Sequence, residues 1–216
     1  TKERIIMCVN DKIYEFATSA TTLPAAVYQH KDPDHIFTSI TSSGAAIYVS
    51  GYSGIQSNIY KFTLESTGAM PTLTQAITAA ELPVGEITFK ISYYLGYMAI
   101  GTNQGVRIAA LSDTDGSINY GPLLFETDQP VYDFAFRDKF IWASTGVEGQ
   151  VGVTRINLGQ EVSQFIFAYA WDLYDPADTL GHYTTACAFM GETNRLAFCN
   201  AGNGADGAVY VESATE

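Results

Sequence analysis

A pair of short apolar strands joined by a turn recurs along this chain. The first strand of each pair places an aromatic residue or Met before a small or medium-sized residue, and the five copies are Met7-Cys8-Val9, Tyr48-Val49-Ser50, Met98-Ala99-Ile100, Trp142-Ala143-Ser144 and Phe198-Cys199-Asn200. In three copies the second strand follows at one offset, from Tyr48 to Tyr60, from Trp142 to Thr154 and from Phe198 to Tyr210. This regularity predicts one repeated hairpin geometry, with Tyr48, Trp142 and Phe198 as buried equivalents.

Prolines mark the start of each new unit. Pro33, Pro83, Pro130 and Pro176 each stand shortly before a new apolar strand. Because proline lacks the backbone donor that a central strand needs, these positions indicate crossovers between sheets. The units recur about every 41 to 56 residues and contain four short strands, which is typical of propeller blades.

We therefore predict an all-β fold, a β-propeller of four-stranded antiparallel blades over residues 1–216. Three complete blades are expected at about 35–82, 86–128 and 131–173, and two partial blades at about 3–30 and 182–216. A generic antiparallel sandwich is the alternative, although it has no reason to repeat its strand order and its proline positions.

The two partial blades carry an expectation of their own. The first lacks an innermost strand and the last ends after its third strand, so each contains second and third strands and neither completes the other. We expect the chain to be part of a longer polypeptide, with other parts of that polypeptide or neighbouring subunits covering the terminal apolar faces.

Charge and hydropathy limit the classes of partner that we expect for this chain. The 216 residues carry 11 Lys and Arg against 23 Asp and Glu, a formal net charge of -12. Nucleic-acid binding depends on cations that neutralise phosphates, so nucleic acid is not an expected partner. No apolar run approaches the roughly 20 residues that span a bilayer, and no signal peptide is visible, so membrane insertion is not expected.

The cysteines predict no metal site and no disulfide framework. Cys8, Cys187 and Cys199 are odd in number and have no CxxC spacing, so buried reduced thiols are expected, although Cys187 could face Cys199 across a hairpin. The segment 112–117, Ser-Asp-Thr-Asp-Gly-Ser, resembles part of a calcium loop but lacks its remaining acids, and it predicts a hairpin turn. No metal and no cofactor are expected.

Three polar residues open innermost strands. His35, Glu86 and His182 could converge at one mouth of a central channel as a metal or substrate site. The alternative is that polar residues at strand starts beside a water-filled channel need no ligand. His30 lies in a charged crossover and has no evident partner.

A further candidate is a crossover that interleaves aromatic and acidic residues. Aromatic faces stack on sugars and carboxylates accept hydrogen bonds from sugar hydroxyls, so a glycan-binding surface is one interpretation. The alternative is that the segment packs in the fourth blade and turns the chain. The candidate ligand-binding residues are Tyr169, Trp171, Asp172, Tyr174 and Asp175.

No catalytic motif is present. The sequence contains no GxSxG, HExxH or P-loop, and no Ser, Cys or Lys in a recognisable nucleophile context. We therefore predict no enzymatic activity, although propeller enzymes can collect catalytic residues from separate blades.

Three stretches carry a resemblance to a known family. Residues 46–54 with 58–62, residues 133–138 and residues 171–175 look like the propeller region of minor tail proteins from long-tailed phages of actinobacteria. The resemblance covers most of the chain and rests on blade signatures. It implies a virion protein at the tail tip, with other tail proteins as partners, and it supplies no catalytic residues.

The first functional hypothesis is thus a non-enzymatic structural and host-attachment component of a phage tail tip. Its partners would be other tail proteins, the remainder of its own polypeptide and a host cell-wall glycan, with a homo-oligomer as a further option. The alternatives are a propeller lectin that binds surface glycans and a propeller hydrolase or lyase. The absence of a signal peptide counts against the lectin, and the absence of nucleophile motifs counts against the enzyme.

Overall fold

Five β-sheets follow one another along the chain. A computed structural model describes residues 4–44, 46–64, 76–124, 130–147, 150–158, 162–167, 184–200 and 208–212. Within these ranges the regular structure is all strand, and no helix is long and apolar enough to cross a lipid bilayer. The chain divides into two compact units, residues 1–98 with 109–120 and residues 99–108 with 121–216.

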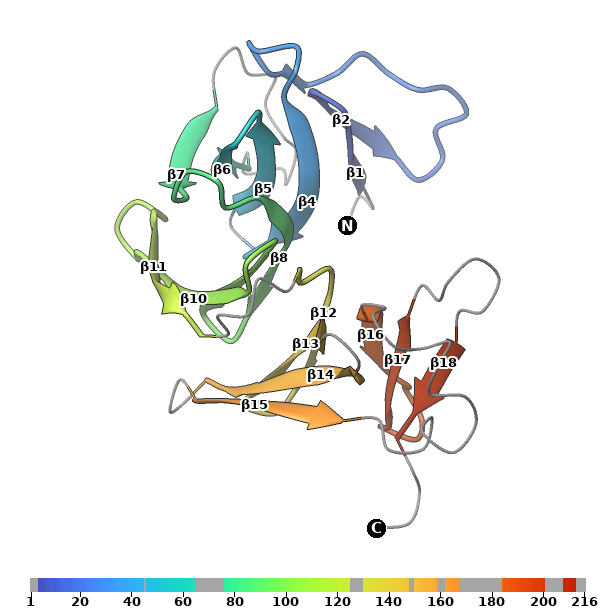
Figure 1. Cartoon of the computed structure of the whole chain (residues 1–216). Coiled ribbons are helices and arrows are strands. Elements are labelled where there is room, and N and C mark those ends of the chain that lie inside the picture. Colours follow the sequence, from blue (N-terminus) through green and yellow to red (C-terminus); the bar gives the residue numbers. More distant parts are fainter. Residues whose placement is uncertain are drawn as a thin grey trace. The chain divides into compact units, whose positions relative to one another are not determined.

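Each sheet is built from strands that are consecutive in sequence, so neighbouring strands in a sheet are also neighbours along the chain (Figure 1). The first sheet contains β1 (Arg4–Val9), β2 (Lys12–Ala17) and β3 (Tyr28–Gln29), and the second contains β4 (Ile36–Ser42), β5 (Ala46–Ser53), β6 (Gln56–Thr63) and β7 (Ile77–Glu81). The third contains β8 (Thr88–Tyr94), β9 (Tyr97–Thr102), β10 (Val106–Leu111) and β11 (Ile118–Leu123). The fourth contains β12 (Phe134–Arg137), β13 (Phe140–Val147), β14 (Gln150–Asn157) and β15 (Val162–Phe167), and the fifth β16 (Thr184–Phe189), β17 (Leu196–Asn200) and β18 (Ala208–Val211).

These sheets confirm the predicted all-β class and the four-stranded antiparallel unit. Three sheets have four strands, and the first and last have three strands among the described residues.

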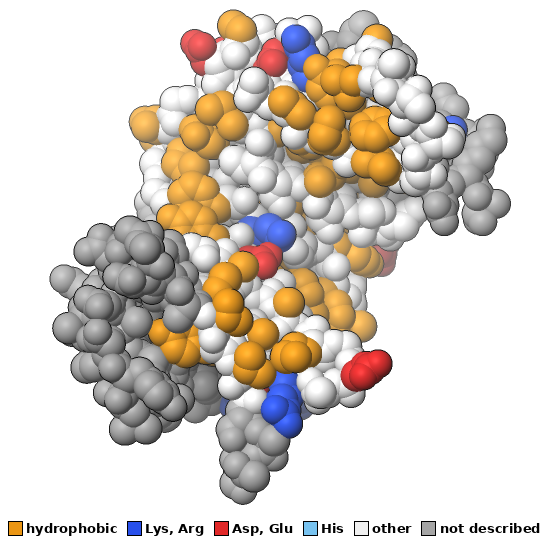
Figure 2. All heavy atoms as spheres, turned by 90° about the vertical axis from the view of Figure 1, so that its right-hand side faces the viewer, with side chains coloured by type: hydrophobic (Ala, Val, Ile, Leu, Met, Phe, Trp, Pro, Cys, Tyr) orange, Lys and Arg blue, Asp and Glu red, His pale blue; other side chains and the backbone are white. Residues whose placement is uncertain are grey.

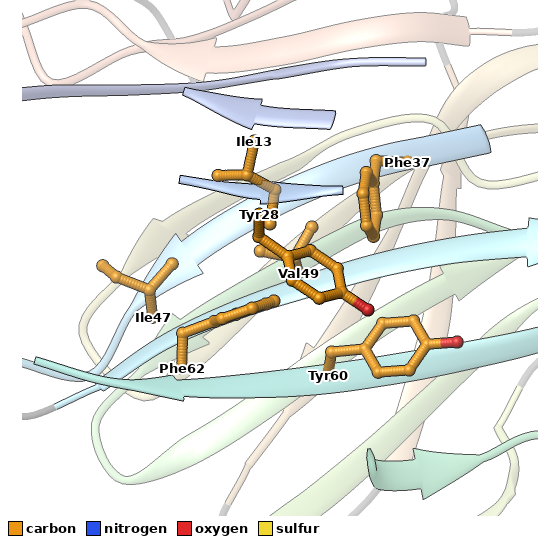
Figure 3. Packing of buried hydrophobic residues seen from close by; sticks show 7 residues of the cluster. All are labelled: Ile13, Tyr28, Phe37, Ile47, Val49, Tyr60 and Phe62. Carbon is orange, nitrogen blue, oxygen red and sulfur yellow. The ribbon is translucent and has the colours of Figure 1, made fainter. Parts of the chain in front are cut away.

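Alternation of apolar residues places the core of the first unit between the β1–β3 and β4–β7 sheets. Ile13 and Tyr28 of the first sheet meet an aromatic and aliphatic set from the second. Tyr28 contacts Phe62 edge-on with ring centroids 5.2 Å apart. Figure 3 shows the seven buried members of this cluster, Ile13, Tyr28, Phe37, Ile47, Val49, Tyr60 and Phe62.

The first strand of a sheet has a free backbone edge, and the preceding sheet supplies its hydrogen-bond partners. Ser39 of β4 accepts a hydrogen bond from the Ile91 N–H of β8 at 3.1 Å and donates one to the Ile91 carbonyl at 3.3 Å. Thr41 accepts from the Tyr93 N–H at 3.1 Å. Since Ile91 is fully buried, these hydroxyls satisfy backbone groups that water does not reach.

In the second unit, too, a side chain of one sheet binds the backbone of the next sheet. The Asp133 carboxylate, just before β12, accepts a hydrogen bond from the Cys187 N–H of β16 at 3.3 Å. Beside it, Arg137 lies 4.5 Å from the Phe189 ring centre and donates a hydrogen bond to the Asn194 carbonyl at 2.8 Å. Arg137 therefore holds the β12–β15 sheet against the β16–β18 sheet through both a cation–π contact and a hydrogen bond.

The predicted identity of the three hairpins holds for two of them and fails for the last. Tyr48 pairs with Lys61 and Trp142 with Arg155, the same separation in both, whereas Phe198 pairs with Tyr210, one residue closer. Phe198 is half-buried and packs against the Trp142 cluster, hence toward the preceding sheet. Trp142 contacts Cys187 and Leu196 of the following sheet, whereas Phe198 faces the preceding one, so the two residues are on opposite faces of their sheets and are not equivalent.

Tyr48 and Trp142, which are 2% and 7% exposed, should therefore behave differently from Phe198. Replacing either by Ala should lower the free energy of unfolding by about 3–5 kcal/mol, since a large buried ring is lost. Phe198→Ala should cost about half as much, because part of the ring is already in water. Urea denaturation of the three variants tests the order, and an equal loss in all three would contradict this register.

The Ser39 hydroxyl offers a second test. Ser39→Ala leaves the buried Ile91 N–H and carbonyl without this partner and should lower the free energy of unfolding by about 1–3 kcal/mol. Ser19→Ala, at an exposed position of the same unit, is the control and should be neutral. Urea denaturation monitored by circular dichroism measures both, and a neutral Ser39→Ala would show that the edge is satisfied in another way.

Candidate functional site

The sequence-derived candidates fall in two groups in the structure. His35 lies just before β4 and Glu86 just before β8, and each is only 1% exposed. His182 lies outside the described residues, as do all five candidate glycan-binding residues, Tyr169, Trp171, Asp172, Tyr174 and Asp175. Convergence of His35, Glu86 and His182 at a channel mouth and sugar binding at residues 169–175 both stay predictions.

His35 instead belongs to a pair that the sequence did not reveal. The rings of His30 and His35 stack with centroids 3.9 Å apart and an interplanar angle of 24°. Phe37 meets the His35 ring edge-on at 4.8 Å, and Tyr60 does so at 5.6 Å. The crossover from β3 to β4 turns through 31–34, which brings positions 30 and 35 together; two histidines flanking a proline turn are the only sequence signal of this contact.

Hydrogen bonds orient the His30 ring. The Asp32 N–H donates to His30 Nδ1 at 3.1 Å, and His30 Nε2 lies 3.0 Å from the Tyr60 hydroxyl. His30 Nδ1 also lies 3.2 Å from the Asp32 carbonyl oxygen, to which it can only donate, so the contacts of this ring fit either tautomer.

His35 is the more deeply buried member of the pair. Its Nε2 is buried and has no hydrogen-bond partner. Burial, with a smaller contribution from a charge on His30, lowers the pKa of His35 from 6.5 to about 4, although the Asp32 and Asp11 carboxylates oppose this shift. A side chain at Gly51 would place its Cβ 2.4 Å from His35 Nε2, so β5 must carry glycine opposite the ring. His35 is therefore neutral near pH 7 and tightly enclosed.

Hydrogen bonds to the Asp32 side chain hold the crossover 31–34 in place next to the histidine pair. Ser53 donates a hydrogen bond to the Asp32 carboxylate, and the Asp34 N–H donates to the same carboxylate at 3.0 Å. These bonds lower the pKa of Asp32. The carboxylate is thus ionised and held in place at the end of the β4–β7 sheet.

Apolar residues are exposed at the same end of this sheet. Ile36, Ile55 and Val84 are 43%, 64% and 70% exposed. The Gly85 N–H donates to the Ile55 carbonyl at 2.8 Å, which ties the β5–β6 turn to the crossover that carries Val84. We call Ile36, Ile55 and Val84, with Asp32 and Asp34, the crossover edge.

The other motifs behave as structural elements. The segment 112–117 is a hairpin turn, as predicted, with the Gly116 N–H donating to the Ser112 carbonyl at 2.8 Å. Hydrogen bonds lower the pKa of Asp115 to about 2; the Ser117 N–H makes the largest contribution, and the Ser112 and Ser117 side chains add to it. Among the described residues no group of three or more His, Cys, Asp and Glu is placed to hold a metal ion.

The three cysteines are free thiols. Cys187 pairs across the ladder with Phe198 and Cys199 with Ala186, so the two cysteine side chains are on opposite faces of the β16–β18 sheet and do not face each other. Burial raises the pKa of Cys8 to about 12, so this thiol is inert packing.

Hydrophobic side chains are numerous on one face of the molecule. Figure 2 shows this face, on which only a few basic and acidic side chains lie among them. That face offers no continuous basic surface, in keeping with the net charge of -12.

Comparison with known proteins identifies the fold. No known protein family matches the chain, and no curated protein matches its sequence. Among solved structures, it is similar to the β-propeller domain of Cps50 (Swd1) from Myceliophteria thermophila, with a TM-score of 0.57 and 11% identity over 92% of this chain and 64% of that one.

Two further structures agree. TolB from Acinetobacter baumannii gives a TM-score of 0.59 with 12% identity over 97% of this chain and 50% of that one. A chain of the nidogen/laminin complex gives 0.60 with 12% identity over 91% of this chain and 70% of that one. At these identities the likeness shows the fold alone, and the described sheets are those of a β-propeller region.

The buried histidine predicts acid sensitivity. Because the folded state holds His35 neutral, its stabilising contribution is complete above pH 6.5 and is lost as the pH falls from 6.5 to 4, where the unfolded chain alone binds the proton. Unfolding free energies measured by urea titration between pH 7.5 and 4 should fall by up to about 3 kcal/mol more in the wild type than in His35→Phe. Parallel pH profiles for the two proteins would contradict the burial of a neutral His35.

Proposed function

We propose that this chain is a non-enzymatic structural and host-attachment component of a phage tail tip. In this proposal the chain contributes three complete and two partial propeller blades to a larger protein of the virion. Its partners are other tail proteins, the remainder of its own polypeptide and a cell-surface receptor of the host, including cell-wall glycan. The resemblance of residues 46–54 with 58–62, 133–138 and 171–175 to actinobacteriophage minor tail proteins supports the virion assignment.

The crossover edge is the observation that carries the attachment role. Exposed large aliphatic residues are unfavourable in water, and here three of them gather at one end of a sheet whose turns are held by backbone hydrogen bonds. Rigid presentation lowers the entropic cost of binding, since the surface does not have to be ordered on contact. The edge therefore has the character of a recognition surface.

The acids of the edge suit a hydroxyl-rich or cationic partner. Asp32 is fixed by Ser53 and Asp34 and retains lone pairs for further donors. An ionised carboxylate beside aliphatic side chains matches the polar and apolar faces of a sugar, and it also matches a basic protein surface. The nidogen/laminin complex, to which the chain is similar in fold, is itself an assembly between proteins.

The experiment compares two edges of the same unit. Ile55→Asp combined with Val84→Asp should reduce binding of the purified chain to host cell envelopes by about tenfold or more, because an apolar contact is replaced by charge. Leu95→Asp is the matched control, since Leu95 is 61% exposed in the β8–β9 turn at the opposite end of the strands, and it should bind as the wild type does.

The virion assignment has its own measurement. Mass spectrometry of purified particles of the encoding phage should detect the chain, and antibody labelling should place it at the tail tip. Particles without the chain, or equal envelope binding by the double variant and the wild type, would contradict the proposal.

A further inference from the structure

The crossover from β3 to β4 is tied to the backbone of the unit only at its two ends. The His30 N–H donates to one carbonyl of the β1–β2 turn at 2.8 Å, and the Phe37 N–H donates to another at 2.9 Å. Between these ends, the hydrogen bonds described for residues 31–34 are internal to the crossover or run to side chains. A segment with so few backbone ties can open while the strand ladders stay intact.

The His35 ring is what this crossover buries against the β4–β7 sheet. The side chain is 1% exposed, and its Nε2 has no hydrogen-bond partner among the described residues. The His30 ring covers one face at 3.9 Å, the Phe37 and Tyr60 rings meet it edge-on, and Gly51 lies opposite Nε2. A neutral ring can leave a lone pair unused at Nε2, whereas a protonated ring places an N–H there that needs an acceptor.

The titratable groups around His35 belong to the crossover, to the β1–β2 turn and to β6. They are His30 and Asp32, Asp11, and Tyr60 respectively. The other charges of the crossover, Lys31 and Asp34, are exposed. Burial, with a smaller contribution from His30, lowers the pKa of His35 to about 4, and the two carboxylates oppose this shift. The enclosure therefore disfavours the protonated ring even with two carboxylates nearby.

We propose that proton uptake by His35 opens the crossover 30–35 while the sheets of the unit stay folded. The protonated ring leaves its aromatic enclosure, where Nε2 has no acceptor, and enters water. Hydrogen bonds lower the pKa of Asp32, so this carboxylate is still ionised in mild acid and can pair with the released imidazolium.

Opening changes the crossover edge as well. Asp32 and Asp34 lie within the crossover and Ile36 follows it directly, so three of the five residues of that edge move when the crossover opens. This acid response is a property of the unit by itself and does not depend on which partner the edge binds.

Proton linkage gives the size of the effect. The opened state binds the proton more readily than the closed state, so the opened state gains as the pH falls. With a pKa of 6.5 for His35 in water and about 4 in the closed crossover, opening becomes about 70-fold more favourable between pH 7.5 and pH 4.5. Most of this gain falls between pH 6.5 and pH 4, the two pKa values.

Amide hydrogen exchange detected by NMR tests the proposal. Protection factors, in which each observed rate is compared with the intrinsic rate at the same pH, are measured at pH 7.5 and pH 4.5. The His35 and Phe37 N–H groups, which close the crossover, should lose about 70-fold in protection. The amides of the β5–β6 ladder should keep theirs, as should the Gly116 N–H in the turn 112–117 of the same unit.

Global unfolding exposes the same histidine, and the pattern of exchange separates it from local opening. If all amides lost protection together, the proton would be taken up only on global unfolding, and the proposal would be wrong. Unchanged protection of the Phe37 N–H in mild acid would contradict it as well.

Substitutions identify the group that takes up the proton. His35→Gln and His35→Phe have no titratable ring, so the acid response of the Phe37 N–H should be lost in both. His30→Phe is the matched control, because it keeps an aromatic ring against His35 and should keep most of the response. A response that survives both substitutions of His35 would overturn the proposal. So would a response that is lost in His30→Phe while its crossover remains protected at pH 7.5.

Discussion

The free backbone edge of the first strand in each sheet is the constraint on which the rest of this structure depends. A strand at a sheet edge has N–H and carbonyl groups that the sheet does not pair, and each one buried unpaired costs about 1–3 kcal/mol, comparable with the gain from burying one large apolar side chain. Here the preceding sheet supplies the partners, through the Asn10 carbonyl for Phe37, the Ser39 hydroxyl for Ile91 and the Asp133 carboxylate for Cys187. Neighbouring sheets are therefore joined by hydrogen bonds as well as by apolar packing, and these hydrogen bonds restrict how far one sheet can slide on the next.

The histidine pair is a local consequence of the same arrangement. The Phe37 N–H bond to Asn10 pulls the start of β4 against the first sheet, and His35 is buried two residues earlier. Once inside, the ring has an aromatic environment and a glycine at position 51, but no acceptor or donor for Nε2. A neutral imidazole tolerates that environment far better than a charged one. The crossover edge therefore lies next to a buried histidine whose neutral form is stable at neutral pH.

The crossover edge arises mainly from turns and crossovers. Asp32, Asp34, Ile55 and Val84 lie outside the strands, whereas Ile36 opens β4 and pairs with Tyr52. Residues in turns and crossovers can vary without disturbing the sheets, so most of this edge is decoupled from the strand ladder.

Much of the architecture follows from the sequence. The alternating strands, the prolines before each new unit and the missing strands of the terminal units predict the all-β sheets that the structure contains, because hairpins and turns are decided by neighbouring residues. The reduced cysteines and the turn at 112–117 follow for the same reason. The contacts of His30, the burial of His35 and the face occupied by Phe198 do not. They depend on how a crossover folds back and on which sheet covers a strand, and these are decided by packing between segments far apart in the sequence, which only the tertiary structure brings together.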